Sequence, residues 1–140
     1  MTPMAKRIQV WFPEEIVSQI TARGADFSDS IRESLSRYYA LVNDARQGLQ
    51  GRFTEAELGL LADISNSTYF EAHSLQGLLW NAQDCGPDGS WEKWGVNEKE
   101  MLEKLKTLTL TEHAALVDAC ERWWAAVSKG FQPEIKQLLR

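Results

Sequence analysis

The sequence predicts a mainly α-helical protein that begins with one short strand. Residues 6–12 alternate apolar and polar side chains, and a period of two is typical of a half-buried strand. Most of the remaining chain repeats apolar side chains at helical spacing, and several of these stretches open with helix-capping residues. A chain of 140 residues is long enough to bury a substantial core.

The predicted strand has one apolar face and one mixed face. A single strand cannot satisfy its own backbone donors and acceptors, and the sequence offers no second strand to pair with it. We therefore expect it to pair with the same strand of a second copy, in a two-stranded antiparallel ribbon that fits the major groove of DNA. The apolar face holds Ile8, Val10 and Phe12, and the other face holds Arg7, Gln9 and Trp11.

Two helices are predicted after the strand. The first begins at Pro13, because proline and the acidic residues that follow it favour a first helical turn. Gly24 is expected to end this helix. The second helix begins after Asp26, a capping residue with Asp29 three positions later. The apolar positions are Ile16, Val17 and Ile20 in the first helix, and Ile31, Leu35, Tyr38 and Val42 in the second.

The order of these elements resembles the ribbon-helix-helix family, the Arc- and MetJ-like repressors. The likeness is carried by the strand 7–12, the Pro-Glu-Glu-Ile start at 13–16, Gly24 and the run 28–35, and it covers residues 6–46. The resemblance implies an intertwined homodimer that binds DNA. Together with the helical pattern of the later residues, this predicts a mainly α fold class: an N-terminal ribbon-helix-helix (one strand, two helices, intertwined dimer) followed by a small helical bundle. The predicted domains are residues 1–47 and 52–140.

The resemblance also implies which residues contact DNA. Arg7, Gln9 and Trp11 match the base-reading positions, where Arg suits guanine and Gln suits adenine. Trp11 departs from the small polar or basic residues usual at its position, and it could instead be covered by the protein's own C-terminal region. Arg7 could be only a solvated strand residue, and Ser28 only a cap. The expected phosphate contacts are Lys6, Phe27 and Ser28.

The apolar side chains of this segment predict self-association. A segment of roughly 45 residues is too short to close a core of its own. We therefore expect a homodimer in which both copies contribute to one core. The expected dimer-core residues are Ile8, Val10, Phe12, Ile16, Ile20, Ile31 and Leu35.

Charge argues against a protein that coats DNA without selectivity. Residues 1–50 hold six basic and six acidic side chains, and residues 51–140 hold nine basic and fourteen acidic ones. Non-specific DNA affinity comes from neutralising phosphates, so binding must rest on a few directed contacts. No apolar run is long enough for a membrane span, and no secretion signal is recognisable. Cys85 and Cys120 have no ligand-type spacing and are expected to be buried thiols in the cytoplasm.

Residues 52–140 are predicted to be helical, after a boundary in the glycine-rich stretch 47–51. Thr54 and Glu57 have the spacing of a capping box, flanked by Phe53 and Leu58 as a hydrophobic staple. Similar start signals recur along this part of the chain. They are Thr68 with Glu71, Asn97 with Glu100, Thr109 with Glu112, and Pro133 before a short terminal helix.

No constellation in this part predicts an enzyme, a metal site or a cofactor. The sequence lacks a glycine-rich phosphate loop, a paired Cys or His motif and a nucleophile elbow. His73 and His113 are expected at the surface or at its boundary. Five of the six tryptophans lie here, and we expect them to pack the core rather than line a ligand pocket. This part is expected to support higher oligomerisation, or to bind an effector or a protein partner.

Three functions follow from these observations. The first is a homodimeric, sequence-specific DNA-binding transcriptional regulator, and we expect a repressor. The second is the antitoxin of a toxin–antitoxin pair, although antitoxin tails are usually short and poorly ordered, unlike the capped helices predicted here. The third is an interaction protein that uses its N-terminal segment only to dimerise, which the neutral charge of residues 1–50 favours.

Overall fold

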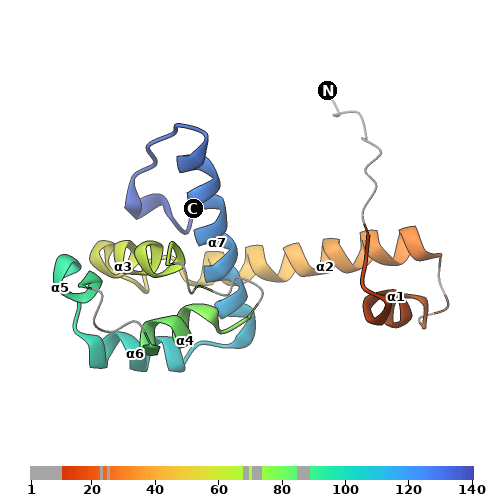
Figure 1. The fold of residues 1–140 in the computed structure, drawn as a ribbon, viewed down its shortest axis with the longest axis horizontal. Coiled ribbons are helices and arrows are strands. Elements are labelled where there is room, and N and C mark those ends of the chain that lie inside the picture. Colours follow the sequence, from red (N-terminus) through yellow and green to blue (C-terminus); the bar gives the residue numbers. More distant parts are fainter. Residues whose placement is uncertain (1–10, 23, 25, 68–69, 71–73, 85–88) are drawn as a thin grey trace. The chain divides into compact units, whose positions relative to one another are not determined.

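The structure is a computed structural model. It describes residues 11–22, 24, 26–67, 70, 74–84 and 89–140. Every regular element in these ranges is a helix (Figure 1). The chain forms two compact units, Met1–Tyr38 and Tyr39–Arg140, and the division falls inside the second helix.

The first unit contains α1 (Glu14–Thr21) and the beginning of α2 (Phe27–Gly48). The second unit contains the rest of α2, which ends in the glycine-rich stretch, and all the later helices. These are α3 (Glu55–Ser65), α4 (Gly77–Asp84), α5 (Ser90–Trp94), α6 (Glu98–Lys106), α7 (Leu110–Ser128) and the 3₁₀ turn η1 (Ile135–Gln137).

The predicted ribbon-helix-helix is wrong, because the described part of the chain contains no strand. Most of the strand expected at residues 6–12 lies outside the described residues. Its last two residues, Trp11 and Phe12, have no strand geometry and lead directly to Pro13 and α1. An alternation over seven residues indicates only that one face is apolar, whereas a strand also needs a hydrogen-bonding neighbour. No strand in the described ranges provides one.

The predicted helix starts at Thr54, Asn97 and Thr109 are confirmed. The start expected at Thr68 with Glu71 is not: these two residues lie outside the described ranges, residues 74–76 are not helical, and α4 begins at Gly77. Thr54 and Glu57 form the expected capping box: the Glu57 backbone N–H donates to the Thr54 hydroxyl at 3.1 Å, and the Thr54 N–H donates to the Glu57 carboxylate at 2.8 Å. Thr109 and Glu112 repeat this arrangement at the start of α7. Asn97 caps α6: its side-chain oxygen accepts a hydrogen bond from the Glu100 backbone N–H, with 3.0 Å between nitrogen and oxygen.

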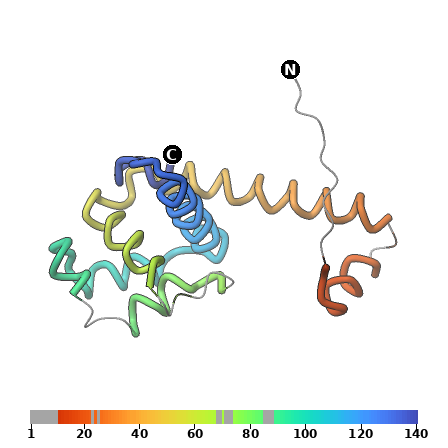
Figure 2. Tube along the Cα trace, turned by 45° about the horizontal axis from the view of Figure 1, so that its top comes forward, coloured from red at the N-terminus to blue at the C-terminus, as the bar shows by residue number. Residues whose placement is uncertain are grey.

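Helix α3 forms the centre of the second unit. Seven of its eleven residues are buried, and it packs against α4, α5, α7 and η1. A helix that is covered on nearly all sides is typical of a core element. The chain beyond α7 returns to this core (Figure 2). The Gln50 side-chain amide donates to the Leu139 carbonyl. Fully buried members of the core include Leu60, Leu61, Leu78, Met101, Leu105 and Leu116.

Tryptophans contribute to this core, as expected, except for Trp80 of α4, which is 49% exposed. Trp91 is buried, and Trp94 lies directly over Gly59 of α3. The Trp94 indole N–H donates to the Asp63 carboxylate at 2.7 Å. The indole of Trp124 on α7 donates to the Ala62 carbonyl at 2.9 Å. Buried indoles normally find such acceptors, so these rings fix the position of α3 by both packing and hydrogen bonding.

The core leaves no reactive thiol among the described residues. Cys120 is fully buried on α7, and its sulfur lies 3.9 Å from the Leu61 carbonyl oxygen. Burial raises the pKa of this thiol to about 12. Thiolates are the reactive form of cysteine, so Cys120 acts as a small apolar core residue, as expected. Cys85 lies outside the described residues.

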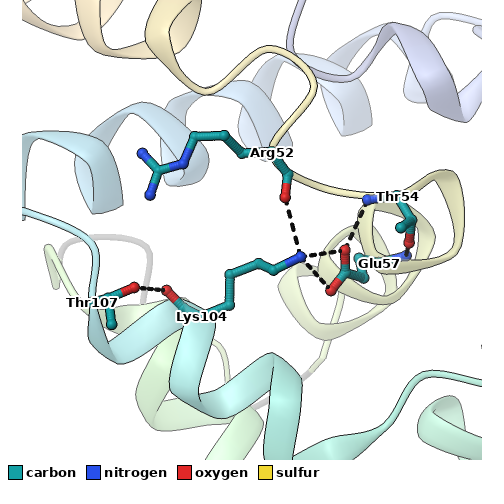
Figure 3. Close-up of polar contacts among 5 residues, drawn as sticks. All are labelled: Arg52, Thr54, Glu57, Lys104 and Thr107. Atoms are coloured by element: carbon teal, nitrogen blue, oxygen red, sulfur yellow. Dashed lines mark hydrogen bonds and ion pairs between the residues drawn. The ribbon is translucent and has the colours of Figure 1, made fainter.

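An ion pair links α6 to the start of α3 (Figure 3). The Lys104 ammonium contacts both carboxylate oxygens of Glu57, at 2.8 and 2.9 Å, and donates to the Arg52 carbonyl at 3.1 Å. Burial raises the pKa of Glu57, but the hydrogen bond and charge of Lys104 and the bonds from Thr54 outweigh it and hold the pKa below 4.5. The Arg52 side chain forms a second ion pair with Glu112, so both capping boxes are braced by a basic residue.

Lys104→Ala is expected to lower the free energy of unfolding of the second unit by about 1–3 kcal/mol, since it leaves a largely covered carboxylate without its main partner. Denaturant unfolding followed by tryptophan fluorescence measures this loss. Lys106→Ala removes an exposed ammonium from the same helix and should change stability little. Equal effects of the two substitutions would contradict a specific role for the Lys104–Glu57 pair.

Candidate interaction surface

The first unit is built from two helices with recognisable ends. Pro13 precedes α1, whose first turn carries the expected acidic pair. Gly24 follows the helix with a φ of +72°, a left-handed conformation that glycine adopts at low cost. At the start of α2, the Asp29 backbone N–H donates to the Asp26 carboxylate at 3.4 Å. The sequence therefore predicts both helices correctly.

The described residues of the first unit contain almost no core. Ser30 is the one buried residue among them, at 3% exposure. The large apolar side chains remain in contact with solvent, and Trp11 and Leu35 are 89% and 51% exposed. Apolar area in water is unfavourable by about 25 cal/mol per Å². We define the N-terminal apolar surface as Trp11, Phe12, Ile16 and Leu35, the large apolar side chains exposed in residues 11–37.

Helix α2 has exposed apolar residues near its start and covered ones near its end. Its apolar residues recur at alternating spacings of four and three, the pattern of a helix that packs along one seam. The later members of this stripe are covered within the second unit, whereas Leu35 is exposed and Ile31 is only partly buried. The stripe comprises Ile31, Leu35, Tyr38, Val42, Ala45 and Leu49.

Aromatic contact is present beside this surface. The rings of Phe12 and Phe27 meet edge to face, with centroids 6.0 Å apart and planes at 77°. Such a pair is worth about 0.5–1.5 kcal/mol beyond the area it buries. It ties the chain just before α1 to the first residue of α2, yet Phe12 stays 38% exposed. The pair therefore orders the chain locally without completing a core.

The expected DNA-contacting residues fall into two groups. Lys6, Arg7 and Gln9 lie outside the described residues, as do the dimer-core residues Ile8 and Val10. Trp11 is described and projects into solvent. The ring of Phe27 is partly buried against Phe12, and the Ser28 carbonyl accepts from the Arg32 guanidinium at 3.4 Å.

Every expected dimer-core residue that the structure describes keeps some of its apolar side chain in contact with solvent. Phe12, Ile16 and Leu35 are exposed, while Ile20 and Ile31 are partly covered. Tyr38 is also exposed, at a position of the α2 stripe that the predicted dimer core omits. The 4–3 spacing of that stripe is visible in the sequence, so the sequence alone indicates that Tyr38 lies on the same face of α2 as Ile31 and Leu35.

Charges near the start of α2 are mostly paired within the helix. Arg32 contacts Asp29 at 3.1 Å, and Arg37 contacts Glu33 at 3.5 Å. All four side chains are largely exposed, so each pair contributes little to stability. Asp26 adds a carboxylate at the same helix start. In the described residues of this unit, five acidic and two basic side chains accompany the exposed apolar ones, so the surface is apolar and acidic rather than basic.

A comparison with protein-family models, curated proteins and solved structures found no match to this chain. None of the helices in the described ranges has the length and hydropathy needed to cross a membrane. The same residues contain no cluster of three or more His, Cys, Asp or Glu side chains suited to a metal ion.

Proposed function

We propose that this protein is a homodimeric, DNA-binding transcriptional regulator of the cytoplasm, with the N-terminal unit as its dimerisation module. The observation that carries the proposal is the absence of a core in the described residues of that unit. The described residues of this unit expose Phe12 before α1, Ile16 of α1 and Leu35 of α2, and they bury only Ser30. A second copy offers the same apolar side chains, so both surfaces can be covered at once in a symmetric contact.

DNA is the partner that the sequence supports for such a dimer. Arg7 and Gln9 precede α1 and have the side chains best suited to read guanine and adenine in the major groove. Dimerisation would present two copies of these residues to two half-sites. The proposal assigns base contacts to the segment before α1 without assigning it a strand. The second unit would then provide higher oligomerisation, or a site for an effector or protein partner.

A second candidate is a dimeric interaction protein that does not bind DNA. It is favoured by Asp26 and Asp29 at the start of α2, because carboxylates there repel a phosphate, and by the pairing of Arg32 within its own helix. The antitoxin hypothesis has less support. Residues 39–140 have a packed core of their own, whereas an antitoxin tail usually folds only on its toxin.

Sedimentation of the full-length protein over a wide concentration range tests the dimer. We expect a reversible monomer–dimer equilibrium, with loss of helical content from α1 on dilution, because α1 buries no residue of its own. A protein that stays monomeric at high concentration with its N-terminal helices intact would refute the proposal.

Arg7→Ala and Gln9→Ala are each expected to weaken binding to the preferred DNA sequence by about 1–3 kcal/mol and to relax base preference at one position. The preferred sequence is first selected from random DNA by the full-length protein, and mobility shifts then compare the variants. Arg140→Ala and Gln132→Ala are matched controls, since both residues are exposed in the second unit. If no sequence is enriched, or if both N-terminal variants bind like wild type, the DNA-binding proposal fails.

A further inference from the structure

His113 occupies a position where the fold otherwise uses an apolar residue. Helices α3 and α7 both begin with a capping box, and an apolar residue precedes each cap. In α3 the residue after the capping glutamate is Leu58, which is buried with Phe53. The matching residue in α7 is His113, behind the buried Leu108. The sequence-based expectation that His113 lies at the surface or at its boundary is therefore wrong.

The imidazole of His113 is enclosed without a hydrogen bond. Its residue exposure is 1%, and neither ring nitrogen has a hydrogen-bonding partner in the described structure. The Leu105 carbonyl at the end of α6 is near enough to favour a charged ring but does not reach hydrogen-bond geometry. A neutral imidazole already loses hydration in such a place, and an imidazolium would lose far more.

Few charges near His113 could compensate for its protonation. Glu112 is the neighbouring charge that favours the imidazolium, but its carboxylate is paired with Arg52. On α3, Glu57 is paired with Lys104 of α6. Helix α4 carries a single charged residue, an exposed aspartate at its end, and Asp63 of α3 is bonded to Lys93 and Trp94.

We propose that His113 is an acid-sensitive switch: its protonation opens the junction between the end of α6 and the start of α7. The imidazolium gains hydration only if the ring leaves its enclosed position. Because His113 is the fourth residue of α7, its exit loosens the first turn of that helix. This inference concerns the second unit alone and does not rest on the proposed function.

The expected pH window lies below 6.5. Burial lowers the pKa of His113 from its usual 6.5, so the stability it contributes is present above pH 6.5 and is lost as pH falls toward the lowered pKa. Burial raises the pKa of Asp118 and Glu121. Protonation of these two acids as the pH falls therefore stabilises the fold, whereas protonation of His113 destabilises it. Hydrogen bonds from Thr109 and the nearby Arg52 hold the pKa of Glu112 below 4.5. The stability that the ionised Glu112 contributes to the fold is therefore lost only below that pH.

Hydrogen exchange of the full-length protein between pH 7.5 and 5.0 tests the switch. Protection factors at the α6–α7 junction are compared in wild type, His113→Leu and His73→Gln, with α3 amides as the internal reference. In wild type the junction protection is expected to fall by up to about tenfold per pH unit below 6.5, the limit for uptake of one proton. His113→Leu, which copies the residue at the matching place in α3, should abolish the change, and His73→Gln should keep it.

Three results would overturn the proposal. One is a junction whose protection falls equally in wild type and in His113→Leu. Another is a parallel loss of protection in α3, which would mean global unfolding rather than a local opening. The third is a His113 ring that titrates at or above pH 6.5 by NMR in wild type, a measurement that stays decisive if His113→Leu does not fold.

Discussion

Leu35→Asp is expected to leave the protein monomeric at concentrations where the wild type is a dimer. Leu35 is the most exposed aliphatic side chain among the described residues of the N-terminal unit. Burial of one leucine contributes about 1.5 kcal/mol or more, and a symmetric dimer buries two. The loss of about 3 kcal/mol corresponds to roughly a hundredfold weaker association. Two unpaired carboxylates in the interface would weaken it further.

Analytical ultracentrifugation measures this effect, and Leu110→Asp is the matched control. Leu110 is 56% exposed at the first position of α7 in the second unit, so the control adds the same charge to a similar leucine. Circular dichroism at high concentration shows whether the helices persist in both variants. A Leu35→Asp protein that still dimerises with wild-type affinity would remove the N-terminal apolar surface from the interface.

Gly59→Ala is expected to destabilise the second unit by about 1–3 kcal/mol or more, the cost of overpacking a filled core. A Cβ atom at this position would lie 2.6 Å from three ring carbons of Trp94. The indole cannot withdraw freely, because its N–H is bonded to Asp63. The helix-propensity gain of alanine over glycine is only about 1 kcal/mol and cannot offset such a clash.

Thermal or denaturant unfolding measures the loss, and Gly48→Ala is the control. Gly48 is the last residue of α2, and an added Cβ there meets no atom within 4 Å. That substitution should be neutral or slightly stabilising. The double variant Gly59→Ala/Trp94→Leu should lose less than the sum of the single variants, since the smaller side chain removes the clash. Additive losses would show that the ring contact is not the cause.

Helix starts are the part of the fold that the sequence predicts best. The capping box of Thr54 and Glu57 involves bonds across only three residues, and the same is true of Thr109 and Glu112. Because each capping box depends only on residues three positions apart, a few neighbouring residues are enough to predict where the helix begins. Gly24, which the sequence marks as a helix end, also follows α1 in the structure.

Tertiary features explain the failures. The alternation at residues 6–12 carries no information about a pairing strand, and none is present in the described ranges. His113 holds the place after a capping box that the buried Leu58 holds in α3, but its polar ring does not by itself indicate burial. For the candidate surface, the sequence predicts that Phe12, Ile16 and Leu35 lack cover within their own segment, and they are exposed.

The position of α2 across the two units has a consequence for the energetics of assembly. Initiating an isolated helix is costly, because several residues must be fixed before the first hydrogen bond is gained. The second unit meets this cost when it buries Val42 and Leu49, the later positions of the stripe. Residues 27–38 then extend an existing helix and keep the phase of its stripe. An interface that uses Leu35 would be partly preorganised, which reduces the conformational entropy lost on association.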